Sequence, residues 1–216
     1  MTANTADASG AGEPPDYRLE RSDVVAALSS FVPTTVPARA KRAASVALAI
    51  GGTPGHRRLL LTKRPSRLRA HPGQFALPGG SVDPGESSVE ACLRELHEEL
   101  GLRADQDAVL GRLDDYETRS GYVITPFVVW VGDRLAELKP SPDEVAIVYE
   151  VGVSEIDIDP RFVTIEQSER PVIQWPFRES LVHAPTGAVV HQFREVVLRG
   201  RHTRVADFEQ PVFAWR

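Results

Sequence analysis

Three glutamates, Glu95, Glu98 and Glu99, occupy positions i, i+3 and i+4 of a predicted helix and therefore share one face. Glu95 and Glu99 repel each other by roughly a few tenths of a kcal/mol, and the last helical turn disfavours anions. A solvated acidic face is the ordinary interpretation of such a cluster. Within the longer pattern described below, we interpret the three carboxylates as ligands for a hard divalent cation, Mg²⁺ or Mn²⁺.

Arg94 directly precedes the first of these glutamates and can reach other acids nearby. Glu90 and Glu98 lie four residues before and after it, and Glu86 lies in the preceding loop. Charges of opposite sign at this helical spacing attract each other, so we expect Arg94 to hold the acids in place. An ordinary surface ion pair is the alternative interpretation.

The helix that carries these acids has local start and stop signals. Ser87 followed by Glu90 has the spacing of a capping box, which predicts a helix that begins near Ser87. Gly101 suits the left-handed position just after a helix. Apolar residues at helical spacing predict a stripe that faces a core, and we expect the glutamates to face well away from it. This stripe consists of Val89, Leu93, Leu96 and Leu100.

The 23 residues from Gly80 to Leu102 follow one pattern: Gly, five spacers, Glu, seven spacers, Arg-Glu-aliphatic, a spacer, Glu-Glu, a spacer and Gly-aliphatic. Average residue usage would produce it by accident on the order of once in ten million chains of this length. The pattern is the Nudix box, so the chain resembles the Nudix hydrolases, which cleave diphosphates linked to another moiety. The resemblance implies a mixed α/β (α+β) fold, with a mixed sheet sandwiched between helices.

The resemblance also implies roles for individual residues. Glu95, Glu98 and Glu99 would be the metal-binding acids, and a backbone carbonyl of the Gly79-Gly80 turn would also reach a metal. The reaction would be an in-line attack of a metal-activated water on phosphorus. The metals would neutralise the charge of the diphosphate and of the leaving oxygen, and this would supply most of the lowering of the activation barrier.

A further acid lies in the segment 141–145. In enzymes of this family a loop acid in this region approaches the metals and acts as a base or an extra ligand. Glu144 is the candidate here, because it is followed by Val145 at the start of a predicted strand. A purely structural role in capping that strand is the alternative interpretation.

The segment 60–80 resembles the signature of the coenzyme A pyrophosphatase branch of the Nudix family. It implies hydrolysis of coenzyme A or acyl-coenzyme A to 3′,5′-ADP and (acyl-)4′-phosphopantetheine. Two positions depart from the signature, since Pro65 replaces a small residue and Leu77 an aromatic one. The alternative is therefore a Nudix pyrophosphatase for ADP-ribose, a dinucleotide cofactor or a nucleoside triphosphate. The residues in register are Leu60, Leu61, Thr62, Arg64, Arg69, Gly73, Pro78, Gly79 and Gly80.

The same segment is basic in an otherwise acidic chain. Arg64 and Arg69 can form a phosphate cradle, because guanidinium groups match phosphate oxygens in a bidentate fork. We assign Lys63, Gly73 and Phe75 to the same substrate site. A solvated basic loop is the alternative for the cations, and a core position is the alternative for Phe75 as an adenine-stacking platform.

Composition limits the remaining classes of function. The chain has 216 residues, 42% hydrophobic and 25% charged, with a net charge of −5, which predicts a globular protein that binds no nucleic acid. The Nudix resemblance implies a small nucleotide-diphosphate substrate instead. Its single cysteine, Cys92, excludes an intrachain disulfide and favours the cytoplasm. We expect it to be packed rather than nucleophilic. No run of apolar residues is long enough to span a membrane.

The expected organisation is a disordered tail over residues 1–18 and a single Nudix hydrolase domain over 19–216. Helices are expected at 23–31, after a cap at Ser22, in the box, and near Ser154. Strands are expected at 44–50, 58–63, before Pro78, at 108–118 and 122–131 as a hairpin, and at 142–152.

The last third of the chain has weaker signals. Alternating segments around 188–194 and 194–198 suggest strands. Enzymes of this branch place a Trp-Gly-like step before a C-terminal helix, and this sequence ends at that step with Trp215. We therefore expect the helix to be missing and its packing to come from the N-terminal helix or from a second subunit in a homodimer.

Overall fold

A computed structural model describes residues 18–37, 41–68 and 72–215. Of the predicted tail, only Arg18 belongs to the described residues. Arg69 also lies outside them. The first elements are α1 (Arg21–Ser30), β1 (Arg42–Gly51), β2 (Arg58–Lys63), β3 (Phe75–Ala76), β4 (Gly79–Ser81), α2 (Ser88–Leu100) and the 3-10 turn η1 (Gln106–Ala108). They are followed by β5 (Val109–Arg112), β6 (Tyr116–Glu117), β7 (Tyr122–Gly132), η2 (Arg134–Glu137), β8 (Ile147–Gly152), α3 (Val153–Ile156), β9 (Arg161–Ile165), β10 (Ser168–Phe177), β11 (Ser180–His183), α4 (Thr186–Phe193), the π-helical turn η3 (Arg194–Leu198) and η4 (Val212–Ala214).

The main sheet is mixed, as the sequence predicts. Its strand order is β3-β2-β1-β7-β5, with β4 paired to β1, β6 to β7 and β8 to β2. The central strands β1 and β7 run parallel, in a register that places Ala44 opposite Ile124 and Ile50 opposite Trp130. The other pairs in this sheet are antiparallel. A parallel pair at the centre is buried on both faces, which explains why β1 is almost continuously apolar.

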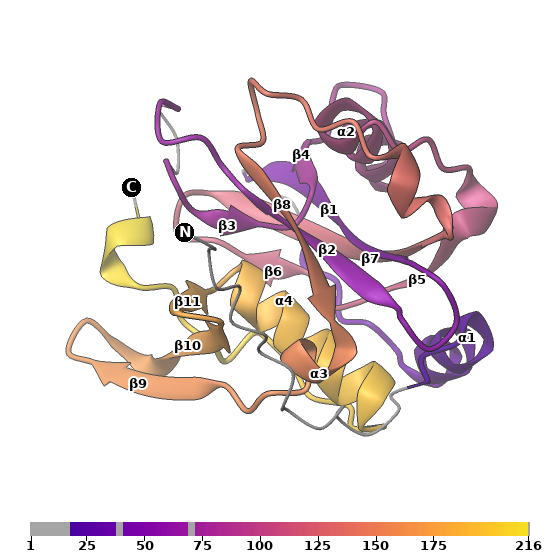
Figure 1. Ribbon diagram of the computed structural model, residues 1–216. Helices are drawn as coiled ribbons and strands as arrows, with labels where there is room; N and C mark the ends of the chain where they lie inside the picture. The colour runs from indigo at the N-terminus through magenta and orange to yellow at the C-terminus, as the bar shows by residue number, and fades with distance from the viewer. Residues whose placement is uncertain (1–17, 38–40, 69–71, 216) are drawn as a thin grey trace, which may run out of the picture.

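Helices cover both faces of this sheet (Figure 1). Successive side chains of a strand point to opposite faces, so β1 and β2 supply two separate cores. One core contains Ala47, Ala49 and Leu60 with Cys92, Leu96 and Leu100 of α2. The other contains Leu48, Ile50, Leu59 and Leu61 with Leu28 of α1 and Val189 and Phe193 of α4. The predicted mixed sheet between helices is confirmed.

The C-terminal third differs from the sequence prediction. The segments 188–194 and 194–198 form the helix α4 and the turn η3, and not strands. Every residue of α4 is buried, so the helix lacks the polar face from which a helical period is normally recognised. Part of the packing on this face comes from the N-terminal helix α1 through Leu28, as expected, and the rest from α4 and η3 through Val189 and Val196.

A second, three-stranded sheet was not predicted as such. Its order is β11-β10-β9, all antiparallel. Trp175 and Phe177 of β10 belong to the same core as Leu61 of the main sheet, so the small sheet and α4 pack together beneath the main sheet (Figure 1).

The remaining predictions of secondary structure hold with shifted bounds. The strand at 58–63 matches β2. The first helix begins at Arg21, earlier than expected, because its N-cap is Glu20 and not Ser22. The Glu20 backbone N–H donates to the Asp23 carboxylate at 3.2 Å. The predicted hairpin pairs β7 with two short strands, β5 and β6, and the strand before α3 begins only at Ile147. Among the described residues, no helix has the length and apolar character needed to cross a membrane.

Candidate active site

The ends of α2 lie where its local sequence predicts them. The Ser87 hydroxyl accepts a bond from the Glu90 backbone N–H at 3.3 Å, and the Glu90 carboxylate accepts one from the Ser87 N–H at 2.8 Å. Gly101 ends the helix with φ 73°, a conformation that glycine adopts without a steric cost. The predicted apolar stripe packs on the sheet, and its Leu96 and Leu100 are fully buried. The caps set the length of α2, and the packing of its apolar stripe sets which face the helix turns toward the sheet.

Two glycines in β4 leave space for those acids. A Cβ atom on Gly80 would lie 2.2 Å from Oε1 of Glu95, and one on Gly79 would lie 2.2 Å from the Ser45 carbonyl oxygen. Real Cβ atoms do not approach other atoms so closely. The Gly79 backbone N–H also bonds to the Glu99 carboxylate. Gly79 and Gly80 of β4 therefore contact both Glu99 and Glu95, and the metal site itself stays a prediction.

Arg94 connects the acids, as the spacing predicts. Its guanidinium donates to Glu86 from Nε at 2.9 Å and to both Glu95 and Glu98 from Nη1 at 2.9 Å. It also bonds to the Ser81 carbonyl at 3.1 Å. These contacts lower the pKa of the Glu86 carboxyl, with the Arg94 hydrogen bond as the largest cause. Glu90, the other predicted partner, caps the helix instead.

Glu99 differs from the sequence prediction, because it does not face away from the core. Its exposed fraction is 5%, whereas Glu98 is exposed and Glu95 is partly buried. Glu99 follows Cys92 and Leu96 by seven and three residues, so it shares their helical face. Burial raises the pKa of Glu99 to about 8, and repulsion from Glu95 adds to the effect.

The carboxylates of Glu95, Glu98 and Glu99 suit a hard divalent cation, although they are not gathered around one point. The pKa of Glu95 is also raised, by burial first, and Glu98 and Glu144 add to this. Acids that disfavour their own ionisation in this way would be stabilised by a divalent cation. Within the described ranges, no group of three or more His, Cys, Asp or Glu side chains has a metal-binding arrangement. Arg94 holds the Glu95 and Glu98 carboxylates in ion pairs instead.

Glu144 lies close enough to affect the other acids. Its charge contributes to the raised pKa values of both Glu95 and Glu99. The loop is attached to the end of α2, because the Ser141 N–H donates to the Glu99 carbonyl at 2.9 Å and the Glu144 N–H donates to the Ser141 carbonyl at 3.2 Å. The strand that follows begins only at Ile147, so Glu144 belongs to a turn and its side chain is exposed.

A cavity of about 1350 Å³ begins at β4. Gly79 and Gly80 line it, as do four residues assigned from the sequence to the substrate site: Lys63, Arg64, Gly73 and Phe75. The fifth such residue, Arg69, lies outside the described residues. Phe75 lines the cavity and also packs against the core, with its ring centroid 5.6 Å from those of Tyr149 and Phe177; its stacking on adenine stays a prediction.

Several cations in this cavity lack an acidic partner. Arg42, Lys63 and Arg64 line it, and none of them is ion-paired with a carboxylate within residues 18–37, 41–68 and 72–215. The Nε atom of Arg64 is buried without a hydrogen-bond partner. Arg67, in contrast, pairs with Asp143 at 3.0 Å and does not line the cavity. The free cations make this wall suitable for a polyanion.

The opposite wall was not identified from the sequence. It is built by the turn at 118–122, by residues 180–186 of β11 and the start of α4, and by the C-terminal residues Phe213, Ala214 and Trp215. These segments come from distant parts of the chain and carry no recognisable motif. The unexpected C-terminal Trp215 was the only hint of this wall in the sequence.

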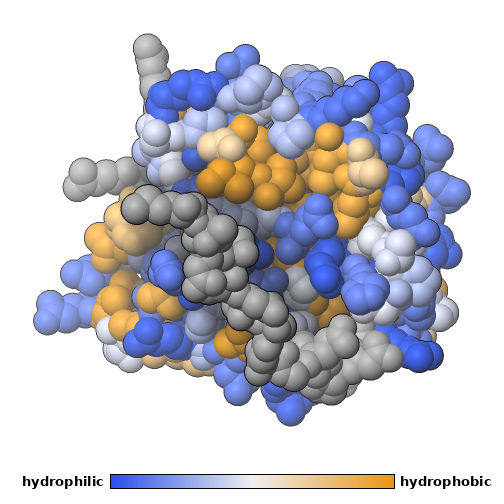
Figure 2. Space-filling view, viewed as in Figure 1, coloured by the Kyte–Doolittle hydropathy of each residue, from blue (hydrophilic) through white to orange (hydrophobic). Residues whose placement is uncertain are grey.

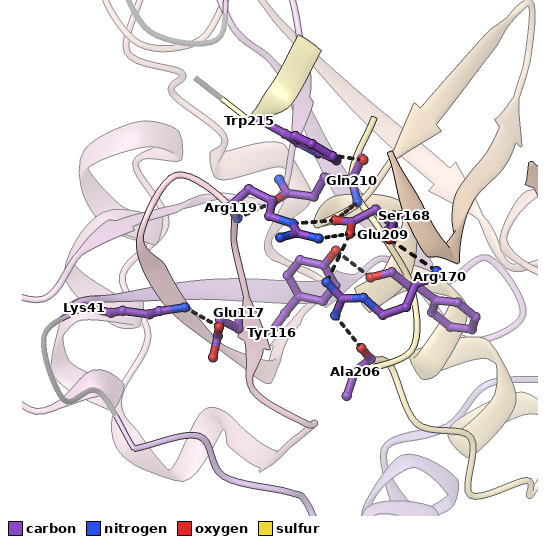
Figure 3. Close-up of polar contacts among 11 residues, drawn as sticks. Lys41, Tyr116, Glu117, Arg119, Ser168, Arg170, Ala206, Glu209, Gln210 and Trp215 are labelled. Carbon is purple, nitrogen blue, oxygen red and sulfur yellow. Dashed lines mark hydrogen bonds and ion pairs between the residues drawn. The ribbon is translucent and has the colours of Figure 1, made fainter. Parts of the chain in front are cut away.

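A buried acid holds this wall together (Figure 3). Glu209, with an exposed fraction of 1%, accepts bonds from Arg119, Arg170, Ser168 and its neighbour Gln210. Burial raises the pKa of Glu209, but these bonds outweigh it and lower the pKa to about 2. The network ties the turn before β7 to β10 and to the C-terminal segment.

Comparisons with known proteins agree with the box. The model of the NUDIX domain family matches residues 41–183. An uncharacterized Nudix hydrolase NudL from Photorhabdus laumondii is 35% identical over 149 residues, which cover 64% of this chain and 76% of that protein. Nudix hydrolase 3 of Caenorhabditis elegans is 36% identical over 120 residues, or 54% of this chain and 50% of that protein.

Solved structures with a similar fold include a MutT protein from Methanosarcina mazei. It is 25% identical, covers 59% of this chain and 83% of its own, and has a TM-score of 0.44. A MutT/nudix family protein from Enterococcus faecalis is 15% identical, covers 78% and 64%, and has a TM-score of 0.49.

Proposed function

We propose a substrate for this chain, which belongs to the Nudix family and is a pyrophosphohydrolase. The proposed reaction is metal-dependent hydrolysis of the diphosphate of coenzyme A or acyl-coenzyme A, giving 3′,5′-ADP and (acyl-)4′-phosphopantetheine. The observation that carries this proposal is the cavity that begins at the Gly79-Gly80 turn and continues along Lys63, Arg64 and Arg42. Cations without acidic partners suit a substrate with a diphosphate and a further phosphate.

The residues of the site have the following proposed roles. Glu95, Glu98 and Glu99, with the Gly80 carbonyl, would hold Mg²⁺ or Mn²⁺, which supplies charge neutralisation for the diphosphate and the leaving oxygen and lowers the pKa of the attacking water. Arg94 orients Glu95 and Glu98 through its ion pairs.

Other residues act on the substrate and on the proton. Glu144, exposed beside the acids, is the proposed general base that accepts the proton of the attacking water. Arg64, Arg69 and Lys63 would bind the phosphates, and Phe75 would contact the adenosine half. Gly73 leaves the backbone of the basic loop close to the substrate.

The test is a chromatographic assay with MgCl₂ or MnCl₂. Coenzyme A, dephospho-coenzyme A, ADP-ribose and a nucleoside triphosphate are each offered to the wild type, to Glu99→Gln and to the matched control Glu169→Gln. Glu169 is exposed on β10, away from the cavity lining. Release of 3′,5′-ADP from coenzyme A by the wild type and the control, and its loss in Glu99→Gln, is expected. Activity on coenzyme A that survives Glu99→Gln would refute the assigned site.

The second candidate is a Nudix pyrophosphatase for another nucleoside diphosphate derivative. Its basis is Pro65 and Leu77, which depart from the signature and are both buried. Equal turnover of dephospho-coenzyme A and ADP-ribose would show that the cations do not recognise the 3′-phosphate, and would favour this candidate.

A further inference from the structure

The far wall of the cavity contains a strip of apolar side chains between polar ones such as Ser180, His183 and Gln210. It includes the buried side chains of Val182, Ala184 and Ala214. Phe213 lies on the same wall, packed edge-on to the His183 ring at a centroid distance of 5.4 Å. Its exposed fraction is 63%, which is large for a phenylalanine. Figure 2 shows patches of apolar surface between hydrophilic ones at the left edge of the molecule, over η4 and the small sheet.

The wall is held rigidly although it lies near the end of the described chain. The Trp215 indole donates to the Gln210 carbonyl at 2.9 Å, and the Gln210 side chain accepts from the Arg119 N–H at 2.7 Å. The Arg119 guanidinium lies over the Trp215 ring at 4.9 Å and also binds Glu209 (Figure 3). The exposed ring of Phe213 is therefore attached to an ordered segment and can serve as a fixed contact surface.

The two walls of the cavity differ in chemistry. The wall at β2 and β4 carries cations without acidic partners, whereas the wall at β11 and η4 contributes an apolar strip that contains Phe213. The volume of about 1350 Å³ exceeds the roughly 300–1,000 Å³ of pockets for drug-sized ligands. A ligand that complements both walls carries phosphates at one end and an apolar chain at the other.

We propose that the wall formed by Phe213 and β11 binds the acyl chain of an acyl-coenzyme A and makes the enzyme selective for acylated substrates. This inference rests on the proposed function, since it takes the phosphates to lie at the β4 end of the same cavity. Phe213 is then a specificity-determining residue. It contacts the acyl chain and none of the reacting atoms, so it affects KM and leaves kcat unchanged.

The test compares Phe213→Ala with Val212→Ala. Val212 is the neighbouring residue of η4, has an exposed fraction of 45% and does not line the cavity. Values of kcat and KM are measured with coenzyme A, butanoyl-coenzyme A and octanoyl-coenzyme A. Phe213→Ala is expected to raise KM for the octanoyl substrate about tenfold, because the chain loses a partly exposed phenyl ring that it would bury. KM for coenzyme A, all kcat values and the Val212→Ala variant are expected to stay within twofold, about the scatter of neutral surface changes.

A binding experiment separates this inference from the proposed function. Dissociation constants of coenzyme A and octanoyl-coenzyme A are measured by calorimetry in EDTA, where no turnover occurs. Tighter binding of the octanoyl compound by the wild type, lost in Phe213→Ala, supports the apolar wall even if neither compound is hydrolysed. The inference would be overturned if Phe213→Ala changed the dissociation constants of both compounds equally, or changed neither. If coenzyme A were still hydrolysed in that case, the proposed function would stand.

Discussion

At the scale of single residues, the acids of α2 have three different environments. Glu98 is exposed, Glu95 lies against Gly80, and Glu99 is buried with a pKa of about 8. Arg94 forms ion pairs with Glu95 and Glu98. The box specifies the residue types, whereas the packing of α2 against β4 determines how deeply each carboxylate is buried.

Arg94→Lys should weaken metal binding rather than unfold the protein. Lysine keeps the positive charge but lacks the fork that contacts Glu86, Glu95 and Glu98 at once. We expect the Mg²⁺ concentration for half-maximal activity to rise about 10–100-fold, as for other residues that orient metal ligands. A Mg²⁺ titration of activity measures the effect.

The control for this variant is Arg134→Lys, which changes a surface pair with Glu137 on η2. Its Mg²⁺ dependence should match the wild type. An unchanged Mg²⁺ dependence in Arg94→Lys would mean that Arg94 is an ordinary surface cation.

At the scale of elements, the approach of α2 to β4 is the feature on which the site depends. Both ends of α2 are capped by its own sequence, and β4 presents Gly79 and Gly80 to it. The position of Gly80 requires the absence of a side chain, because the Glu95 carboxylate occupies that space.

Gly80→Ala should therefore reduce activity without loss of the fold. The added methyl group would lie 2.2 Å from Glu95 Oε1, so the carboxylate must move by about 1 Å, a shift that costs on the order of 100-fold in rate. Gly152→Ala is the matched control, since the nearest atom to its new Cβ would be 3.6 Å away. Circular dichroism and kcat are measured for both; full activity of Gly80→Ala would contradict the assigned position of Glu95.

At the scale of the whole molecule, contacts distant in sequence complete the cavity. Glu209 bonds to Arg119, 90 residues earlier in the chain, and to Arg170, 39 residues earlier. The small sheet and α4 contribute Trp175, Phe177 and Phe193 to the core of the main sheet. The far wall of the cavity is therefore part of the folded core and not an appendage.

The Glu209 network should make stability sensitive to acid. The folded pKa of about 2 lies below the ordinary value of 4.5, so the ionised carboxylate contributes stability above pH 4.5 that is lost as the pH falls toward 2. Glu209→Gln should be about 3 kcal/mol less stable than the wild type near pH 7, because it leaves Arg119 and Arg170 without their partner. Urea unfolding from pH 7 to 2 measures the difference, which should shrink at low pH. A constant difference would exclude the network as its source.

The resemblance of the box implied the mixed sheet between helices, whereas the residues by themselves determined the capped helix α2, the strand β2 and the contacts of Arg94 with Glu86 and Glu98. These follow from capping, periodicity and charge spacing, which act over a few residues. The family follows from the complete box for the same reason.

Only the tertiary structure decided the burial of Glu99, the helical state of α4, the small sheet and the far wall of the cavity. Glu99 is buried by the neighbouring β4, and α4 is buried on all sides, so its own residues show no helical period. The wall that contains Arg119, Phe213 and Trp215 depends on contacts between distant segments, and no local signal in the sequence specifies which of them meet.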